Sequence, residues 1–247
     1  MTIKVAVLGS KGRMGAEVVK AVSNASDLEL VASIDQNDDF NIVKNSGAQV
    51  AVDFTTPDAV MKNLELLIDA GISPVVGTTG FNEEKIAKVQ KMLQAKSGVS
   101  LRLVPNFSIG AILMMRFAKA ATKFYDSAEI IEYHHPNKID APSGTAVRTA
   151  QIIAEERKAN NLSNNPDATI SEIPGARGSK IDGIPVHAVR MQGLVAHQEV
   201  VFGSLGETLT IRHDSFDRES FMPGVLLAIR NIAKKPGLTI GIDDLIN

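Results

Sequence analysis

Short apolar runs alternate with helical patterns through the first hundred residues, and this alternation restricts the possible folds more than any other feature of the chain. Strands are predicted at residues 3–8, 28–35, 50 or 51 to 55, 73–77 and 100–104. Helices are predicted between them, at residues 13–22, 57–70 and 83–95. Alternating strands and helices form βαβ units with right-handed crossovers, so we expect a parallel sheet with helices on both faces.

The pattern changes after Asn106. Helices are predicted at residues 109–123, 144–159 and 220–233, and strands at 127–134, 185–191, 197–202 and 207–213. The last three strands are close in sequence, which favours antiparallel hairpins, and residues 160–183 have the composition of a long mobile loop. We therefore expect an α/β protein with a parallel-sheet domain at residues 1–107, completed by 216–247, and a second α+β domain with a mostly antiparallel sheet at 108–215.

A glycine-rich turn joins the first strand to the first helix. Glycines there allow a tight turn and a close approach of the backbone to a pyrophosphate at the helix N-terminus. The G-x-x-G-x-x-G spacing is one residue longer than the usual fingerprint, but Asp35 lies twenty positions beyond Gly15, where an acid binds ribose hydroxyls. These features predict a Rossmann-type dinucleotide domain, with an ordinary glycine-rich turn as the alternative. The expected cofactor contacts are Gly9, Ser10, Lys11, Gly12, Arg13, Met14 and Asp35.

Two further turns follow the fourth and fifth predicted strands. Ligands of open α/β sheets bind at the carboxyl ends of the strands, so both turns are candidate cofactor contacts, although both sequences also form ordinary turns. Their candidate residues are Gly77, Thr78, Thr79, Val104, Pro105, Asn106 and Phe107. Asp35 favours NAD because its carboxylate would face a 2′-phosphate, whereas Lys11 and Arg13 could neutralise that phosphate. Use of both NADH and NADPH is therefore our hypothesis.

Titratable and anion-binding groups are concentrated in residues 132–146, EYHHPNKIDAPSGTA. His134 and His135 end a predicted strand, and Lys138 follows within a short turn. Ser143 suits the N-cap of the next helix, and the amides near Gly144 and Thr145 would be free to hold an anion. A proton donor, an ammonium and an anion site together suit reduction of a small dicarboxylate. The alternative interpretation is that this segment is a loop with surface histidines beside a capped helix and has no catalytic function.

The composition narrows the class of protein further. The formal net charge is −2, which disfavours a general binder of nucleic acids or membrane surfaces. The chain has no cysteine, which excludes disulfides and thiolate metal sites, and no spacing such as H-E-x-x-H predicts another metal site. No apolar run is long enough for a signal sequence or a membrane span, so we expect a cytoplasmic protein.

The chain resembles the 4-hydroxy-tetrahydrodipicolinate reductase (dihydrodipicolinate reductase) family of bacterial lysine biosynthesis. The resemblance covers nearly the whole chain, and the motifs that carry it are VLGSKGRMG, VDFTTP, GTTGF, PNFSIG, EYHHPNKIDAPSGTA and GIPVHAVRMQGLVAHQEVVFG. It implies that NAD(P)H delivers hydride to C4 of the cyclic substrate, with loss of the 4-hydroxyl as water, to give tetrahydrodipicolinate. It also implies a homotetramer assembled through the second-domain sheet, and a hinge that closes the two domains over the substrate.

The resemblance also implies roles within residues 132–146. His134 matches the proton donor and acceptor, and Lys138 matches a second proton donor or charge stabiliser. His135, Gly144 and Thr145 match substrate contacts, and we expect Ser143 beside them to contribute to the same anion site. One departure concerns the cofactor: many relatives have an arginine after the ribose-binding acid, but Gln36 follows Asp35 here, which argues against a strong preference for NADP.

Two other functions remain as alternatives. One is another Rossmann-type dehydrogenase of a small amino or sugar acid, which the DAPSGTA string disfavours. The other is a non-catalytic dinucleotide sensor, which has no need of the proton donors that the His-His-Lys cluster provides.

Overall fold

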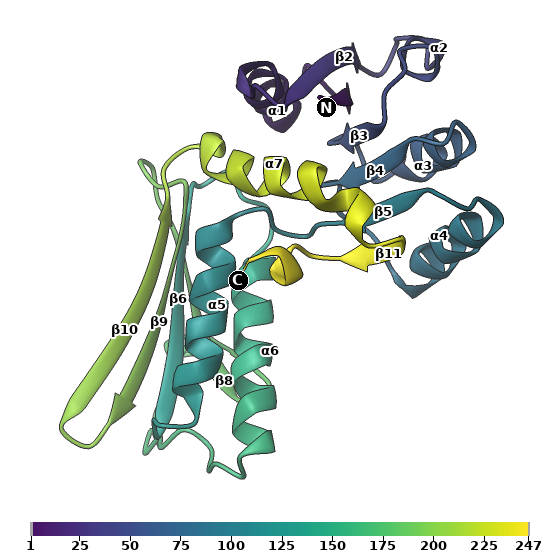
Figure 1. Cartoon of the computed structure of the whole chain (residues 1–247). Coiled ribbons are helices and arrows are strands. Elements are labelled where there is room, and N and C mark those ends of the chain that lie inside the picture. Colours follow the sequence, from purple (N-terminus) through teal and green to yellow (C-terminus); the bar gives the residue numbers. More distant parts are fainter. Residues whose placement is uncertain (1, 247) are drawn as a thin grey trace. The chain divides into compact units, whose positions relative to one another are not determined.

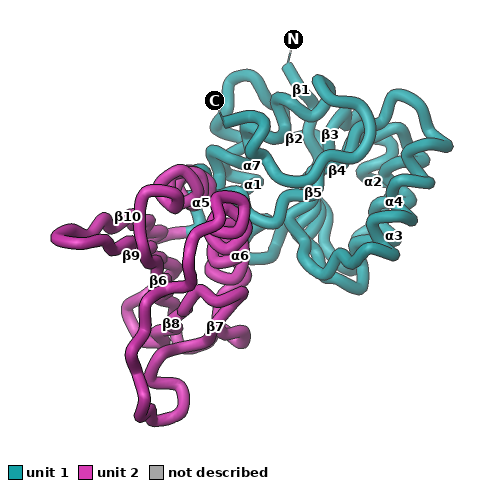
Figure 2. Tube along the Cα trace, turned by 90° about the horizontal axis from the view of Figure 1, so that it is seen from below, with its two compact units in different colours: residues 1–109, 218–247 teal, residues 110–217 magenta. Residues whose placement is uncertain are grey.

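Two separate sheets organise the chain, which is described here from a computed structural model covering residues 2–246. One compact unit consists of Met1–Ile109 with Arg218–Asn247, and the other of Gly110–Asp217 (Figure 2). We call these unit 1 and unit 2. Within residues 2–246, none of the helices is both long enough and apolar enough to cross a bilayer.

Unit 1 contains a six-stranded sheet in which all neighbouring strands are parallel (Figure 1). Its strands are β1 (Ile3–Leu8), β2 (Leu28–Ile34), β3 (Val50–Asp53), β4 (Ser73–Val76), β5 (Ser100–Leu103) and β11 (Gly237–Ile240). The order is β11-β5-β4-β3-β1-β2, so the direction of winding reverses between β1 and β3. Ligands bind at such a switch point, outside the carboxyl ends of the strands.

The helices of unit 1 cover this sheet. They are α1 (Arg13–Asn24), α2 (Asn41–Lys44), α3 (Val60–Asp69), α4 (Glu83–Ala95) and α7 (Met222–Asn231), with 3-10 turns at Arg218–Phe221, Ile232–Lys234 and Asp243–Leu245. Apolar residues of α3 and α4 pack on β4 and β5, and Val43 of α2 packs with residues of β1 and β2. α1 and α7 contact each other. β1 is buried from Val5 to Leu8, as expected for a strand covered on both faces.

Unit 2 contains a five-stranded mixed sheet, in the order β10-β9-β6-β8-β7. Its strands are β6 (Ser127–His134), β7 (Ser179–Ile181), β8 (Ile184–Arg190), β9 (Ala196–Ser204) and β10 (Glu207–Ser215). Two helices, α5 (Ile109–Thr122) and α6 (Gly144–Ala159), lie on the same side of the sheet (Figure 1). They bury an apolar cluster against it that includes Ile130, Ile153 and Phe202. Alternation along β6 therefore directs Ile130, Glu132 and His134 to the helix-covered face, and Glu129 and Tyr133 to the other face.

The predicted fold class is confirmed, with one correction to the pairing of the second sheet. The predicted antiparallel hairpin is confirmed for β9 and β10, but β8 and β9 do not pair, because β6 lies between them. β6 pairs with β9 antiparallel but with β8 parallel. The connection from β6 to β8 contains the whole of α6, which is the crossover that parallel pairing requires.

Two local predictions were also wrong, and one outer strand was not predicted. The helix predicted from residue 57 begins at Val60, after a turn that contains Pro57. The predicted loop at 160–183 contains β7, which forms a short antiparallel hairpin with β8. β11 was not predicted, because its four residues directly follow Lys234-Lys235-Pro236 and lack a long apolar run. It forms the outer strand beside β5.

Candidate functional site

The turn between β1 and α1 brings the backbone of three glycines close together. Gly9 has a φ of +76°, and a Cβ built on it would lie 2.6 Å from the carbonyl oxygen of Phe54. A Cβ on Gly15 would lie 2.0 Å from the carbonyl oxygen of Gly9. Only glycine fits either position. Within residues 2–246 no side chain caps α1 at its N-cap, Gly12, so the first amides of the helix are available to an anion.

Asp35 follows β2 and forms a hydrogen bond with this turn. Its carboxylate accepts the backbone N–H of Lys11 at 2.8 Å and that of Gln36 at 2.9 Å. These two bonds, Gln36 first, hold the pKa of the Asp35 carboxyl below its usual range. The Lys11 ammonium lies 3.9 Å from the carboxylate of Asp38, an acid that sequence reasoning did not consider. The predicted ribose-binding position therefore has two carboxylates and one exposed ammonium.

A buried carboxylate, Asp53, organises the next turns. It is the last residue of β3, 0 % exposed, and lies beside Leu8 of β1. Its oxygens accept the Thr55 hydroxyl at 2.7 Å, the Thr78 hydroxyl at 3.0 Å and the Asn63 amide at 2.9 Å. Because the Thr78 hydroxyl donates its hydrogen bond to Asp53, its oxygen lone pairs can accept a hydrogen bond from a ligand. Sequence reasoning missed Asp53, since an acid in the VDFTTP string has no distinctive spacing.

The other predicted cofactor residues differ in what they can offer a ligand. A Cβ on Gly77 would lie 2.1 Å from the ring of Phe54, so the space beside this glycine is filled by an aromatic side chain, whereas Thr79 is exposed. Val104 and Phe107 are each 3 % exposed, and only their backbone groups are available. The five remaining residues also lie near the carboxyl ends of the strands: Ser10 in the β1–α1 turn, Arg13 and Met14 at the start of α1, and Pro105 and Asn106 after β5.

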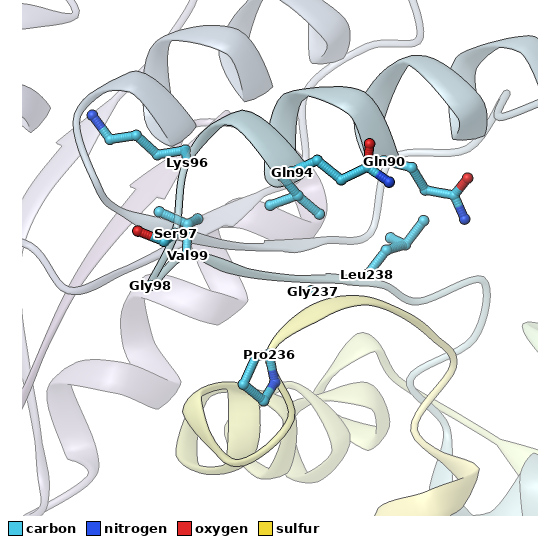
Figure 3. A pocket seen from close by; sticks show the side chains of 10 residues that line it. Gln90, Gln94, Lys96, Ser97, Gly98, Val99, Pro236, Gly237 and Leu238 are labelled. Carbon is cyan, nitrogen blue, oxygen red and sulfur yellow. The ribbon is translucent and has the colours of Figure 1, made fainter.

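Unit 1 also has a pocket apart from these turns, and Figure 3 shows the side chains that line it. It is lined by Gln90, Leu93, Gln94, Lys96, Ser97, Gly98, Val99, Pro236, Gly237 and Leu238. These residues come from the end of α4 and from the chain entering β5 and β11, so the pocket is at the amino ends of the strands. It is therefore distinct from the predicted cofactor turns, which are at the carboxyl ends.

In unit 2, residues 132–146 run from the end of β6 to the start of α6. Glu132 is 0 % exposed and accepts hydrogen bonds from three sides. His134 Nδ1 lies 2.6 Å from its carboxylate, the Arg190 guanidinium donates to both oxygens at 2.7 and 2.8 Å, and the backbone N–H of Ser143 donates at 2.9 Å. Burial alone raises the pKa of the Glu132 carboxyl, but these bonds outweigh it and lower the pKa to about 2.

Lys138 occupies the short turn after the histidines. Its ammonium donates to the carboxylate of Asp140 at 2.7 Å, and its side chain is 21 % exposed. This bond is the main reason that the pKa of the Asp140 carboxyl is lowered. His135 lies in the same turn, where its carbonyl accepts the backbone N–H of Lys138 at 3.2 Å. Asp140 was not predicted as a site residue. Its carboxylate occupies the Lys138 ammonium, with which the carboxylate of a bound substrate would have to pair.

The start of α6 has the form of an anion site. The Ser143 hydroxyl oxygen accepts the N–H of Ala146 at 3.2 Å, which confirms Ser143 as the N-cap. The next residue, Gly144, is open: a Cβ built on it would meet no heavy atom within 4 Å outside its chain neighbours and its own helix backbone. A ligand can therefore approach the N-terminus of the helix at Gly144 without moving a side chain, and Thr145 is the next residue of α6.

The remaining histidines pair within the sheet of unit 2. His197 is buried, with Nδ1 2.8 Å from the carboxylate of Asp214 and with Nε2 accepting the Val195 N–H. His187 Nε2 lies 2.7 Å from the carboxylate of Glu129. Burial lowers the pKa of His213. Among residues 2–246, no group of three or more His, Asp or Glu is arranged to hold a metal ion.

Unit 1 has a doubly wound sheet with a glycine-rich turn and an uncapped helix N-terminus at its switch point. Unit 2, in the same chain, has a histidine, a lysine and an open helix end. Together these features define a nicotinamide-dinucleotide-dependent oxidoreductase. Family models agree with this class. Residues 3–107 match the model "Dihydrodipicolinate reductase, N-terminus", and residues 110–246 match "Dihydrodipicolinate reductase, C-terminus". The chain therefore belongs to the dihydrodipicolinate reductase family.

Individual relatives are similar over their whole length. The chain is 56 % identical to the 4-hydroxy-tetrahydrodipicolinate reductase of Corynebacterium efficiens over 247 residues, which is 100 % of both proteins. It is 58 % identical to the enzyme of that name from Mycobacterium marinum, over 99 % of each. A solved dihydrodipicolinate reductase from Paenisporosarcina sp. TG-14, with dipicolinate bound, is 37 % identical, with a TM-score of 0.87 over 99 % of each chain. These findings confirm the family and the reductase class predicted from the sequence.

Proposed function

We propose that this protein reduces 4-hydroxy-tetrahydrodipicolinate to tetrahydrodipicolinate, with loss of the 4-hydroxyl as water, in the lysine and diaminopimelate pathway. The observation that carries the proposal is the cluster in unit 2. There His134 is hydrogen-bonded to Glu132, and the same carboxylate accepts the backbone N–H of Ser143 at the N-terminus of α6. When bound in the turns of unit 1, the reduced nicotinamide supplies the hydride for C4.

The residues of unit 2 bind the substrate, neutralise its charge and transfer the proton. The helix end at Ser143, Gly144 and Thr145 holds one substrate carboxylate, since the N-terminal amides and the dipole of a helix favour an anion there. His135 and Lys138 neutralise charge on the substrate, and Lys138 exchanges its bond with Asp140 for one with the substrate. His134 transfers a proton through Nε2, because its Nδ1 is bonded to Glu132.

The cofactor preference rests on three charged residues. The carboxylates of Asp35 and Asp38 favour the ribose hydroxyls of NADH over the 2′-phosphate of NADPH. Lys11, 77 % exposed in its side chain, is available to neutralise that phosphate. We therefore propose that both cofactors are used, through the turns of unit 1 identified above. Comparing kcat/KM for NADH and NADPH in wild type and in Lys11→Ala tests this: selective loss of NADPH use is expected, and strict NADH use by the wild type would contradict it.

The reaction itself is tested by NADH oxidation with substrate freshly made from pyruvate and aspartate semialdehyde. His134→Gln should lower kcat by about 100-fold with a modest change in KM, because it removes an interaction made in the transition state. Full activity in this variant would contradict the role of His134. Intact NADH binding without any turnover by the wild type would instead favour a dinucleotide sensor, and turnover of a different small acid would favour another dehydrogenase.

We propose that unit 1 is the dinucleotide-binding domain and unit 2 the domain for substrate binding and assembly. Both helices of unit 2 lie on one face of its sheet, which leaves the face with Tyr133, Glu199 and Val201 without a covering helix from that unit. This uncovered sheet supports a homotetramer assembled through it. We propose the cytoplasm as the compartment, because a chain without cysteine forms no disulfide that an oxidising compartment would favour.

A further inference from the structure

Glu132 has more polar partners than a structural ion pair requires. It lies wholly inside unit 2, two residues before the proposed proton donor, and carries a charge at neutral pH. One oxygen faces His134 Nδ1 and Arg190, and the other faces Arg190 and the backbone N–H of Ser143. Arg190 also donates to the carbonyl of Asp140 at 2.8 Å. The Glu132 carboxylate is thus connected to the end of β6 and to the N-cap residue of α6 directly, and to the turn at Asp140 through Arg190.

We propose that Glu132 is a positioning residue for the reduction: it holds the His134 imidazole with its proton on Nδ1 and fixes that ring relative to the N-terminus of α6. The proposal rests on the proposed function, in which His134 transfers a proton and the helix end holds a substrate carboxylate. The Arg190 guanidinium keeps the carboxylate ionised and stationary.

The geometry fixes which ring nitrogen is free. A carboxylate can only accept hydrogen bonds, so at 2.6 Å the Nδ1 of His134 must be the protonated nitrogen. Nε2 is then the nitrogen that takes up a proton to form the imidazolium and later gives it to the substrate. The same carboxylate accepts from Ser143 at the helix cap, so its two bonds set the separation of proton donor and anion site.

An amide at this position would reverse the arrangement. In Glu132→Gln, the backbone N–H of Ser143 is a fixed donor, so the amide oxygen must take the place of the oxygen that faces it. The amide NH2 then faces His134 Nδ1, which has to become the acceptor, and the Arg190 N–H that donated to the same oxygen loses that acceptor. The neutral ring therefore carries its proton on Nε2, and the imidazolium loses its adjacent counter-charge.

The experiment compares wild type, Glu132→Gln and a control, Glu129→Gln. Glu129 lies on the same strand and also pairs with a histidine and an arginine, His187 and Arg177, but it faces the opposite side of the sheet. Each protein is labelled with 15N-histidine, and His134 is assigned by loss of its signals in His134→Gln. The nitrogen shifts then report the tautomer, alongside kcat, KM and the dissociation constant for NADH.

For Glu132→Gln we expect a 10- to 100-fold lower kcat at neutral pH. His134 should have the Nε2–H tautomer, and NADH binding should be unchanged. The pH profile of kcat/KM should move to lower pH because the imidazolium has lost its carboxylate, while the other charges near it, Lys138, Asp140 and Arg190, remain. Glu129→Gln should lose stability but keep the wild-type kcat and His134 tautomer.

A folded Glu132→Gln with the wild-type tautomer, or with kcat within twofold of wild type, overturns the proposal. If that variant does not fold, Glu132→Asp decides, because it keeps the charge beside Arg190 but is one methylene shorter. It should retain the Nδ1–H tautomer with a reduced kcat, and a wild-type kcat would overturn the proposal. A wild type that shows the Nδ1–H tautomer but does not reduce the substrate contradicts the proposed function instead.

Discussion

At the scale of single residues, two buried carboxylates organise the two groups of candidate site residues. Asp53 holds the hydroxyls of Thr55 and Thr78 in unit 1, and Glu132 holds His134 and the cap of α6 in unit 2. Each is 0 % exposed. A buried charge is tolerated only when several donors surround it, so both residues fix the geometry of whatever donates to them.

A methyl group at Gly144 tests the proposed anion site directly. Gly144→Ala should fold normally, because the added Cβ meets no heavy atom within 4 Å outside its chain neighbours and own helix, and alanine suits a first helical turn. The methyl would obstruct the approach of a carboxylate to the helix amides, so KM for the substrate should rise roughly tenfold or more. Steady-state kinetics and the thermal midpoint measure both effects. An unchanged substrate KM would contradict the site, and KM for NADH serves as the control.

Lys138 should contribute to both binding and chemistry. Removing its ammonium in Lys138→Ala leaves a substrate carboxylate without a cationic partner in the ground state and in the transition state. We therefore expect a lower kcat together with a higher KM, in the same substrate titration. A matched change at Lys123, which lies over the ring of Phe124, should leave both constants unchanged. Wild-type kinetics in Lys138→Ala would remove this residue from the mechanism.

At the scale of elements, two helices with side-chain N-caps form a matched pair. Ser143 caps α6 and Asn82 caps α4, each accepting a backbone N–H three residues further on. Ser143→Ala and Asn82→Ala should each lower the free energy of unfolding by about 1 kcal/mol, measured in urea. Only Ser143→Ala should also raise KM for the substrate, because only α6 is proposed to hold it. Equal kinetics in the two variants would show that the end of α6 is structural alone.

The elements also show where sequence patterns are sufficient. Glu83–Ala95, Ser127–His134 and Gly144–Ala159 were predicted with the boundaries that the structure has, since each has a clear start and a regular pattern. The short elements α2, β7 and β11, of three or four residues, were missed. An element that short has no period to recognise, and it is stable only because a neighbouring element accepts its hydrogen bonds.

At the scale of the whole molecule, Glu132 should make stability depend on acid pH. Its pKa falls from the ordinary 4.5 to about 2 on folding, so it stabilises the protein above pH 4.5, and this stabilisation is lost as the pH falls towards 2. The full effect is about 3 kcal/mol. The difference in unfolding free energy between wild type and Glu132→Gln, from urea titrations, should be about 2 kcal/mol smaller at pH 3 than at pH 7. A difference independent of pH would contradict the low pKa.

Assembly is the second prediction at this scale. Light scattering on the purified protein should give four times the mass of one chain. Val201→Lys adds a charge to the sheet face that α5 and α6 leave uncovered, so it should yield smaller species with intact secondary structure. A monomeric wild type would contradict the homotetramer, and an unchanged tetramer in Val201→Lys would exclude this part of the sheet as the interface.

The sequence by itself determined the fold class, the family and the residues of the DAPSGTA segment, because apolar periodicity and glycine turns are local properties of the chain. Only the tertiary structure decided the partners of those residues. Arg190 is 58 positions from Glu132, and β8 lies beside β6 only because α6 crosses over between them. The Glu132 carboxylate that holds His134 became recognisable once this pairing placed a guanidinium and a helix cap around it, since contacts between distant segments leave no periodic signal in the sequence.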